Sequence, residues 1–560
     1  MKIKFSKTNR AARWFFAAAL TSLGSAAIGG PAAIGEQLRE ATRLPGKPST
    51  PKLEVPPAKP YTKNNEEAHF TVRKISIKGD DLLSEEETVS LKGEIEGKTI
   101  GLEALDRLCA QLTASCRKKG HFLARAYLPQ QEITDGEVVI VILEARLEST
   151  NIVNASHVKD ETVFMRLGMI SKGAPATEES VSMAIASVSD LPGLQILKAA
   201  VSPGRETGGT ILTLTTTPSE RLRGLAYIDN HGAKYTGRNR IGASLIVASP
   251  TGTGDEIGVS VLRSLNAGLN SGLFRYEKPL SMRCNAFLSA SHADYALGEQ
   301  YTELQAHGKS DSFEAGVITT LHRNLDTKFN CTVTVGHRKL NDQMDAVSSQ
   351  NPKEDDYVSA SLAFQHTPTG GGQRHHLDAS IGLMGGNISF LDQTSQSLDL
   401  AGSNTQGSYG IVEAELRYTQ KLSSSSSLSL LARAQQTLDS KNIDGSRRLG
   451  ITGPDGLRAY SPSDLLGDNA SFIRAEYQCA TTLNGEYEAI CGFFAEHGRV
   501  SGGNNASEIA SRSLSDFGVN LKISKSKWSF DASVAFAVNK NYLSEAPGDA
   551  RLLLKASRQF

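Results

Sequence analysis

Residues 528–538, WSFDASVAFAV, alternate between two kinds of side chain and so indicate the fold of most of the chain. Trp528, Phe530 and every second residue up to Val538 are apolar, whereas the residues between them, such as Ser529 and Asp531, are small or charged. Because successive side chains of a strand point to opposite faces, this run predicts a β-strand with one apolar and one polar face.

The same alternation continues through the C-terminal part of the chain. Residues 256–262, EIGVSVL, and residues 411–418, IVEAELRY, again place apolar side chains at every second position. After Pro218 there is no convincing helical pattern for about 340 residues. The strands are expected to be about 10 residues long, with turn signals between them.

Two folds explain this alternation. A soluble β-sandwich would show it as well. A transmembrane barrel has lipid outside and water inside, and about 340 residues at roughly 20 per strand and connection give about 16 strands. The chain ends on Phe560, and a terminal aromatic residue is typical of outer-membrane barrels. We therefore predict a mainly β fold, with a barrel of about 16 antiparallel strands in residues 219–560.

The N-terminus supports an outer-membrane location. A basic run that ends at Arg13 is followed by apolar residues and then by small ones, which predicts a secretory signal peptide over residues 1–27. A membrane anchor is the alternative, because residues 14–34 carry no charge. Their later half consists of Gly, Ser, Pro and Ala, which makes a poor spanning segment.

Residues 28–67 predict a short element held at a distance. Residues 28–44 contain the helix-like run IGEQLREATRL, and residues 45–67 contain six prolines. Proline prevents regular structure and stiffens the chain, so we expect an extended linker. At about 3 Å per residue, roughly 16 residues span some 50 Å, enough to bring the helix into the barrel as a plug.

Residues 68–218 predict two small α+β modules in tandem. A strand, two helices and two further strands occupy residues 68–146, and the same order recurs in residues 147–218. In the longer helix of the first module, an apolar stripe with a period near 3.6 should face the sheet. The stripe comprises Leu102, Leu105, Leu108, Leu112 and Cys116.

Composition and motifs argue against several classes of function. Lys plus Arg and Asp plus Glu both number 60, so the basic excess of a nucleic-acid-binding protein is missing. There is no GxxxxGK[ST] motif to hold a nucleotide. Six scattered cysteines without a CxxC pair argue against a zinc site. No catalytic constellation stands out, so we predict no enzyme, no metal and no cofactor.

The two modules resemble the POTRA domains of two-partner secretion transporters (TpsB, the haemolysin secretion/activation family), a group of POTRA-barrel outer-membrane proteins. Residues 120–147 match the end of the first POTRA module at Gly120, Pro129, Gln131 and Gly136. The usual Glu-Gly that follows is Glu144-Ala145, which affects only the turn into the second module. The second module matches at Leu191, Pro192, Gly193, Pro203, Gly204 and Gly209.

The start of the barrel resembles the same family. The matching positions are Asp229, Asn230, Gly232, Gly237, Arg240, Gly254 and Asp255. Turn chemistry alone would explain each Gly or Pro cluster, but not their family order from about residue 70 to the C-terminus.

The stretch GPDGLRAYSPSDLLGDN, residues 453–469, resembles the family's loop that folds back into the barrel. The tip motif V-R-G-[YF] falls on Leu457, Arg458, Ala459 and Tyr460, and Gly467-Asp468 follows. Ala459 replaces the usual glycine, so a positive φ there would be strained. A solvated loop cation is the ordinary explanation of a single arginine. The resemblance instead implies a partner on the family's F-x-D-x-G strand motif, here Phe494, Glu496 and Gly498.

From the strand pattern, Glu496 shares a face with Phe494 and Gly498. If this face is inward, Arg458 should pair with Glu496, and Phe494 should offer its guanidinium an apolar wall.

A second geometric prediction concerns Cys479 and Cys491. A three-residue hairpin loop centred on Gly485 would set them opposite each other, near disulfide range.

The resemblance implies an outer-membrane transporter with its POTRA domains in the periplasm. It would capture an unfolded exoprotein, a large TpsA-like repeat protein of the haemolysin or adhesin type, and export it through the barrel without ATP. Outer-membrane lipid would be the other partner, with no nucleic acid and no nucleotide. A barrel-assembly insertase is the alternative within the superfamily, although it usually has more periplasmic modules. A passive diffusion porin is the alternative of another class, and it would have neither POTRA domains nor the inward loop.

Overall fold

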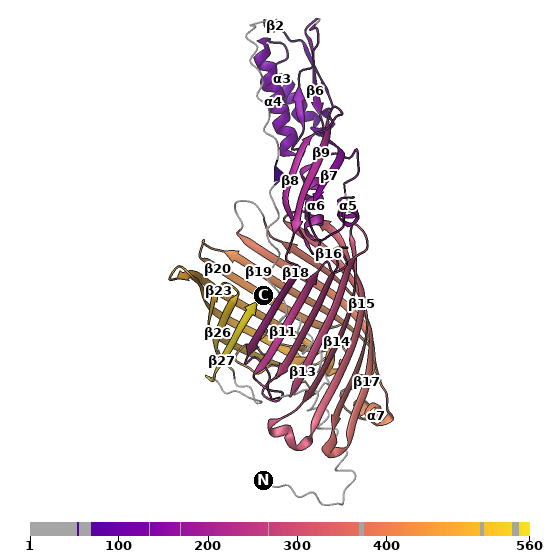
Figure 1. Cartoon of the computed structure of the whole chain (residues 1–560), viewed down its shortest axis with the longest axis vertical. Helices are drawn as coiled ribbons and strands as arrows, with labels where there is room; N and C mark the ends of the chain where they lie inside the picture. The colour runs from indigo at the N-terminus through magenta and orange to yellow at the C-terminus, as the bar shows by residue number, and fades with distance from the viewer. Residues whose placement is uncertain are drawn as a thin grey trace, which may run out of the picture.

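The computed structural model describes residues 53–54, 69–133, 135–168, 170–266, 268–368, 374–504, 509–539 and 548–560. The predicted signal peptide, the predicted plug helix and most of the predicted linker lie outside the described residues. In the described part, a stalk of two α+β modules stands on one end of a large β-barrel (Figure 1). No helix among these residues is both long and apolar enough to cross a membrane.

The barrel is closed and has sixteen strands, each antiparallel to its neighbours, and the last strand pairs with the first. The strands are β10 (Leu222–Asp229), β11 (Arg240–Ala248), β12 (Glu256–Ser264), β13 (Leu269–Pro279), β14 (Cys284–Ala296), β15 (Ala306–Arg323), β16 (Thr327–Met344), β17 (Ser349–His366), β18 (His375–Phe390), β19 (Gly407–Lys421), β20 (Ser426–Thr437), β23 (Asn469–Leu483), β24 (Tyr487–Ser501), β25 (Arg512–Lys525), β26 (Trp528–Ala537) and β27 (Ala550–Gln559). The predicted mainly β fold and strand number are confirmed.

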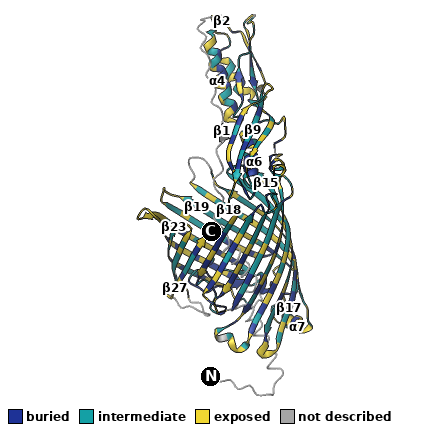
Figure 2. Cartoon of the chain, in the orientation of Figure 1, coloured by how far each residue is buried: buried dark blue, intermediate teal, exposed yellow. Residues whose placement is uncertain are grey.

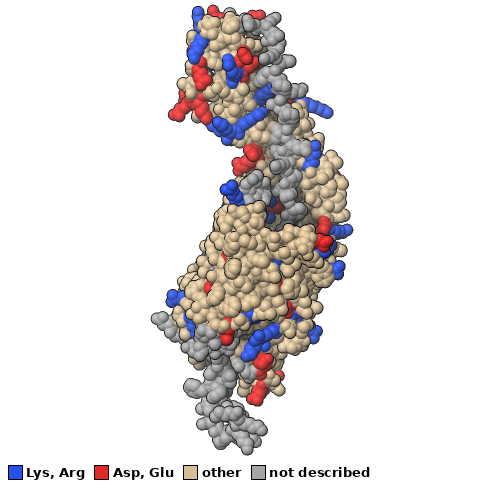
Figure 3. All heavy atoms as spheres, turned by 90° about the vertical axis from the view of Figure 1, so that its left-hand side faces the viewer, with Lys and Arg blue, Asp and Glu red and all other residues tan. Residues whose placement is uncertain are grey.

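Side chains of the barrel strands alternate between lumen and outer surface, as the sequence pattern predicts. On β24, Phe493 is 68% exposed on the outside, while its neighbour Phe494 and the inward Glu496 are nearly completely buried. Figure 2 shows this alternation as a chequered pattern along the strands. On the face seen in Figure 3, charged side chains gather on the modules and at the far rim, and the wall between them is mostly uncharged. Such a wall is suited to lipid.

Two details of the barrel differ from the prediction. The strands are not uniformly about 10 residues long, because β15, β16 and β17 each have 18 residues, whereas β10 has 8. A helix, α7 (Gln393–Ala401), lies in a region expected to have none. It is only 9 residues long, too short for a clear apolar period, and the Asp392 side chain caps it by accepting from the backbone N–H of Ser395.

The first module has the predicted order of elements and a short additional strand pair. Its elements are β2 (His69–Thr71), β3 (Lys74–Lys78), η1 (Asp80–Leu82), α3 (Glu85–Gly93), β4 (Thr99–Gly101), α4 (Leu102–Lys118), β5 (Arg125–Tyr127) and β6 (Glu137–Leu143). In the predicted stripe of α4, every member is buried except Leu102, which is 38% exposed at the first helical position. Burial raises the pKa of the neighbouring Cys109 thiol to about 11.

The second module also has the predicted order, with one unexpected strand. Its elements are β7 (Arg146–Asn154), α5 (Asp160–Leu167), α6 (Glu178–Ser189), β8 (Leu194–Pro203) and β9 (Gly209–Pro218). The unexpected strand is β1 (Leu53–Glu54), which lies in the linker predicted to lack regular structure and pairs in parallel with Ala199 and Ala200 of β8. Leu53 and Glu54 lie between prolines and keep their own N–H groups, so pairing is possible there.

The second module is fixed to the turns at one side of the barrel rim. Arg166 of α5 is buried and donates to the carbonyl of Met282 at 2.9 Å, in the turn between β13 and β14. Asp190 forms ion pairs of 3.0 Å with both Arg323 and Lys328, which flank the turn between β15 and β16. These contacts hold the stalk in place over the β13–β14 and β15–β16 turns.

Candidate functional site

The segment between β20 and β23, residues 438–468, is folded inward, and we call it the inward loop. It contains the short helix η4 (Gly445–Arg447) and the strand pair β21 (Leu449–Gly450) and β22 (Leu466–Gly467). At its tip, Leu457, Ala459 and Tyr460 are at most 1% exposed and pack against inward-facing residues of β23 to β26. The tip is therefore a packed part of the barrel interior, not a solvated turn.

Arg458 lies between two carboxylates of the barrel wall. Its Nη2 atom is 2.9 Å from Oε2 of Glu476, and its Nε atom is 3.4 Å from Oε1 of Glu496. Its backbone N–H also donates to Glu496 at 2.8 Å. The guanidinium carbon lies 4.1 Å from the ring centroid of Phe494. The predicted pair with Glu496 and the predicted Phe494 wall are confirmed, but the shorter side-chain ion pair is with Glu476.

A row of charged residues on three neighbouring strands holds the backbone of the tip. Arg474, Glu496 and Asp516 are register partners on β23, β24 and β25. Arg474 donates to Glu496 and, at 2.7 Å, to the carbonyl of Gly456. Asp516 accepts the backbone N–H of Ala459 at 2.7 Å. Both the side chain and the backbone of the tip are therefore bound to the wall.

Sequence reasoning missed Arg474, Glu476 and Asp516. Strand alternation does place Arg474 and Glu476 on the same face as the aromatic Phe472, which is nearly completely buried. The alternation itself was the available signal, because the intervening residues 473, 475 and 477 are apolar and a lipid-facing charge would be costly.

Ala459 is not strained. Its φ is not among the positive values of the described residues, so the strain considered for a non-glycine residue at this position does not arise. Tyr460 next to it is completely buried, and its hydroxyl lies within hydrogen-bond distance of the carbonyls of Ser515 and Asn539, at 3.0 and 2.9 Å. A short side chain at 459 and a hydrogen-bonded ring at 460 therefore fit the wall of β25.

The remaining motif residues support the return of the loop. Asp468 accepts from Arg448 at 2.8 Å and from the backbone N–H of Gly503 at 2.8 Å, so it ties the loop to the turn after β24. Gly498 lies under the loop, because a Cβ atom there would come within 2.6 Å of Ile451. Gly467 lies in β22 and similarly has no room for a side chain beside Val500.

The motif at the barrel start divides into two places. Asp229 and Arg240 are register partners on β10 and β11 and form a buried bidentate ion pair with distances of 2.9 and 3.1 Å. The carboxamide of Asn230 bonds to β27, accepting from the N–H of Leu554 at 2.7 Å and donating to the carbonyl of Leu552 at 2.9 Å. These residues close the barrel between its first and last strands.

Glycines with close backbone contacts follow in the same connection. A Cβ atom at Gly232 would lie 2.0 Å from the carbonyl oxygen of Gly237, and Gly237 itself has a φ of 109°. By contrast, Gly254 and Asp255 lie at the other end of β11, in the turn that meets the second module. Gly254 has a φ of 68° and contacts Leu191, and Asp255 accepts from the hydroxyl of Tyr276 at 3.1 Å.

The matched positions of the modules lie in turns and sheet contacts. Gln131 forms hydrogen bonds of 2.7 and 2.8 Å with both backbone groups of Val139, so its side chain extends the sheet next to Pro129. Gly120 and Gly136 have positive φ values of 89° and 74°.

In the second module, Gly193, after Leu191-Pro192, contacts Ser249 of the barrel. Pro203 ends β8, and Gly204 and Gly209 enclose the turn at which Glu148 binds. These positions determine the fold and lie outside the cavity described next.

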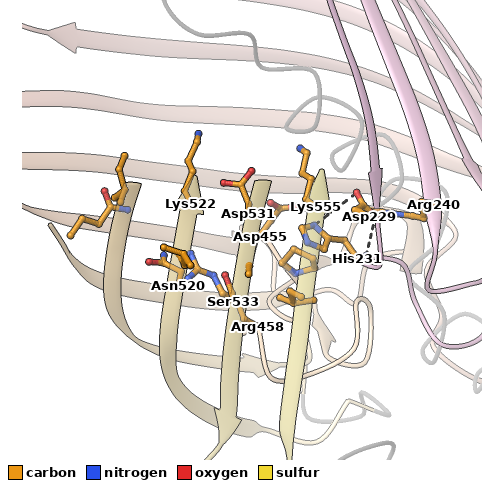
Figure 4. Close-up of a pocket in the computed structure, with 16 residues that line it drawn as sticks. Asp229, His231, Arg240, Asp455, Arg458, Asn520, Lys522, Asp531, Ser533 and Lys555 are labelled. Carbon is orange, nitrogen blue, oxygen red and sulfur yellow. Dashed lines mark hydrogen bonds and ion pairs between the residues drawn. The ribbon is translucent and has the colours of Figure 1, made fainter. Parts of the chain in front are cut away.

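A polar cavity of about 420 Å³ lies beside the loop tip (Figure 4). Two of the predicted groups meet here, because the lining includes Arg458 from the loop and Asp229 and Arg240 from the barrel start. The charged residues of the lining are Asp229, Arg240, Asp455, Arg458, Lys522, Asp531 and Lys555, so both signs of charge are present. In the described part of the chain, no cluster of His, Cys, Asp and Glu is suited to a metal ion.

The hairpin of β23 and β24 has the predicted register but lacks the disulfide. Leu483 pairs with Tyr487, which leaves the three-residue loop 484–486, and Cys479 lies opposite Cys491. Both thiols are free, so the suggested bond is not present. Directly opposed Cβ atoms on neighbouring strands are farther apart than a disulfide prefers.

Residues 208–522, more than half of the chain, match the family described as haemolysin secretion/activation protein ShlB/FhaC/HecB. The chain belongs to this family. Residues 70–145 match the POTRA domain of the ShlB type. The heme/hemopexin transporter protein HuxB of Haemophilus influenzae (strain 86-028NP) is 22% identical over 510 residues, which are 88% of each chain. The outer membrane transporter CdiB of Escherichia coli is 24% identical over 320 residues, 56% of this chain and 54% of CdiB.

Two solved structures have the same fold. CdiB from Escherichia coli superposes with a TM-score of 0.70 at 18% identity and covers 100% of both chains. CdiB from Acinetobacter baumannii superposes with a TM-score of 0.64 at 15% identity and covers 99% of this chain and 100% of that one. The family and the fold together identify an outer-membrane transporter of the two-partner secretion type, which exports an exoprotein through its barrel and has its POTRA domains in the periplasm. A barrel-assembly insertase or a passive porin is not favoured.

Proposed function

We propose that the POTRA domains capture an unfolded, TpsA-like exoprotein and that the inward loop controls its passage through the lumen. The binding of Arg458 between Glu476 and Glu496 is the observation that carries this proposal. A loop whose tip is held by buried charges occupies the interior in a defined position. An exoprotein can pass only when these contacts are exchanged for others.

Capture would use strand addition. An extended segment of the exoprotein can join an exposed sheet edge through main-chain hydrogen bonds. In the second module, the edge strand β8 carries Leu53–Glu54 as its neighbour. Because this contact involves only two residues, a longer exoprotein strand would replace it with more hydrogen bonds.

Export would need no nucleotide. The sequence has no phosphate-binding GxxxxGK[ST] motif, and the periplasm has no ATP. We attribute the driving force to folding of the exoprotein outside the cell, where burial of its apolar surface prevents backsliding. We assign no catalysis, no metal, no cofactor and no nucleic-acid partner to this chain. Outer-membrane lipid would contact the apolar outer face of the barrel.

The test uses Arg458→Ala and Glu496→Gln in cells that also express the exoprotein that this chain exports. Removing one partner of a buried ion pair costs about 3–5 kcal/mol, and less in a wet lumen. We expect an inserted, heat-modifiable barrel that releases little or no exoprotein into the medium. Arg433→Ala is the matched control, because Arg433 is a buried lumen cation whose 3.1 Å ion pair with Glu415 joins two wall strands. Normal secretion by both tip variants would refute the proposed role of the pair.

A further inference from the structure

A second group of buried charges lies at the root of the inward loop, where η4 meets the wall at β16, β17 and β19. It consists of Asp444 and Arg447 from the loop and Lys353 and Asp355 from β17, and we call it the root cluster. The tip binds β23, β24 and β25, whereas the root cluster binds β17 and its neighbours. The inward loop is thus bound at two separate places on the wall.

Arg447 is held on several sides. Its Nε and Nη2 atoms lie 2.7 and 2.5 Å from Oδ2 of Asp355. Its guanidinium carbon is 3.9 Å from the ring centroid of Tyr357. Tyr409 of β19 donates its hydroxyl to the other oxygen of Asp355 at 2.8 Å. Stacking and two ion-pair contacts together give Arg447 a defined orientation that a flexible lysine would reproduce only in part.

Asp444 and Lys353 form the second half of the root cluster. The Nζ atom of Lys353 is 2.7 Å from Asp444 and 3.6 Å from Asp342 of β16. The other oxygen of Asp444 accepts from the backbone N–H of Ser446 at 2.9 Å and so shapes the turn of η4. Arg338 of β16 adds a hydrogen bond of 3.3 Å to the carbonyl of Ser446.

Burial makes these contacts strong. Lys353, Asp355 and Asp444 are 3%, 0% and 5% exposed, so none of them can exchange its partner for bulk water. A buried charge that loses its partner is strongly disfavoured.

The segment between root and tip, by contrast, contains Gly450, Gly453 and Gly456, and Gly453 has a φ of 104°. Glycine allows the backbone conformations that a moving segment needs.

We propose that the root cluster is a second anchor of the inward loop, with Arg447 and Asp355 as positioning residues, and that the tip moves about residues 450–453 while the root stays bound. This inference rests on the proposed gating by the tip. It assigns separate tasks to the two charged groups: the Arg458 contacts open, and the Arg447 contacts keep the loop attached to the wall.

The first experiment measures the fraction of open channels formed by the full chain in planar bilayers, which needs no exoprotein. The variants are Arg447→Ala, Arg447→Lys, Arg458→Ala and the control Arg433→Ala. A root that stays bound in both states does not bias the tip, but its release in Arg447→Ala frees the loop and lowers the effective concentration of the tip at its seat. We therefore expect Arg447→Ala to raise the open fraction several-fold, by less than Arg458→Ala, and Arg433→Ala to leave it near wild type. Arg447→Lys keeps the charge and should recover most of the closed state.

The outcomes separate the two proposals. If Arg458→Ala raises the open fraction and Arg447→Ala does not, the root cluster is no anchor, although gating by the tip survives. If neither variant raises it, even in a chain from which Ile34–Leu44 are deleted, both proposals fail. If Arg433→Ala raises it as much as Arg447→Ala, any lumen cation has this effect and the assignment of the root cluster is overturned.

A second experiment tests whether the root stays bound during opening. Lys353→Cys and Asp444→Cys are combined in a chain whose native cysteines are replaced by alanine, and the pair is joined with a short bifunctional maleimide. With Arg458 intact, cross-linking should return the channel to the closed state. With Arg458→Ala added, the cross-linked channel should still open. A cross-linked Arg458→Ala channel that stays closed would show that opening requires the root to move, and the proposal would be wrong.

Discussion

At the residue scale, the position of Arg458 follows from the charges of three neighbouring strands. A guanidinium keeps its charge in a narrow lumen and therefore needs carboxylate partners. Glu496 is the central partner, because it accepts from the backbone N–H of Arg458, forms an ion pair with the Arg458 side chain and also accepts from Arg474. The sequence pattern predicted that Glu496 faces the loop. It did not identify Glu476 and Asp516, since strand parity shows which acids point inward but not which of them reach a loop.

Gly498 offers a test of the loop position that leaves the charges unchanged. Gly498→Ala would bring a Cβ atom within 2.6 Å of Ile451 in the loop. The close atom is the terminal Cδ1 of Ile451, so the loop side chains should repack at a cost of about 1 kcal/mol, with a modest rise in conductance and a modest loss of secretion. Gly258→Ala on β12 is the control, because a Cβ atom there meets nothing within 4 Å. Equal conductance of the two variants in planar bilayers would contradict the observed seat of the loop.

At the element scale, strand alternation determines which face is lipid-facing but not how long each strand is. The sequence predicted the barrel and its strand number from a period of two. It did not predict the 18-residue strands β15 to β17, because an alternating pattern does not mark where a strand ends. It also missed the pairing of Leu53–Glu54 with β8, since a parallel contact between distant segments has no local signal.

The contact between β10 and β27 is short, with five paired residues, and Asn230 extends it. Asn230→Ala removes one donor and one acceptor, and at about 0.5–1.5 kcal/mol per hydrogen bond the barrel should lose roughly 1–3 kcal/mol. We expect a lower temperature for the loss of heat-modifiable mobility on gels. Asn387→Ala is the control, because that side chain is exposed and bonds to Ser389 of its own strand at 3.0 Å. An unchanged transition in Asn230→Ala would show that the carboxamide does not strengthen the closure.

At the scale of the whole molecule, the stalk covers one side of the rim and the inward loop occupies the lumen. The order of modules and barrel could be predicted because each has its own period and because Gly and Pro mark the boundaries. The attachment of the stalk could not, since the partners Asp190 and Arg323 are distant in sequence and neither belongs to a recognisable motif.

The predicted plug helix, residues 28–44, remains a prediction about the whole molecule. A helix on a proline-rich tether that enters the lumen would reduce the ion flow through the resting barrel. Deletion of Ile34–Leu44 should then raise single-channel conductance in planar bilayers, while barrel assembly remains normal. Replacement of the same residues by a Gly-Ser segment of equal length is the control for chain length. If neither change alters the conductance, these residues do not act as a plug.

Passage of the exoprotein through the lumen is the central claim, and site-specific photo-cross-linking during secretion tests it most directly. A photoreactive residue at Ser533 would lie in the cavity wall beside the loop tip, whereas one at Phe530 of the same strand would lie on the lipid-facing surface. With exoprotein stalled in transit, we predict a cross-linked product from position 533 and none from position 530. Products from position 530 alone would mean that the exoprotein travels along the outside of the barrel, and the account would be wrong.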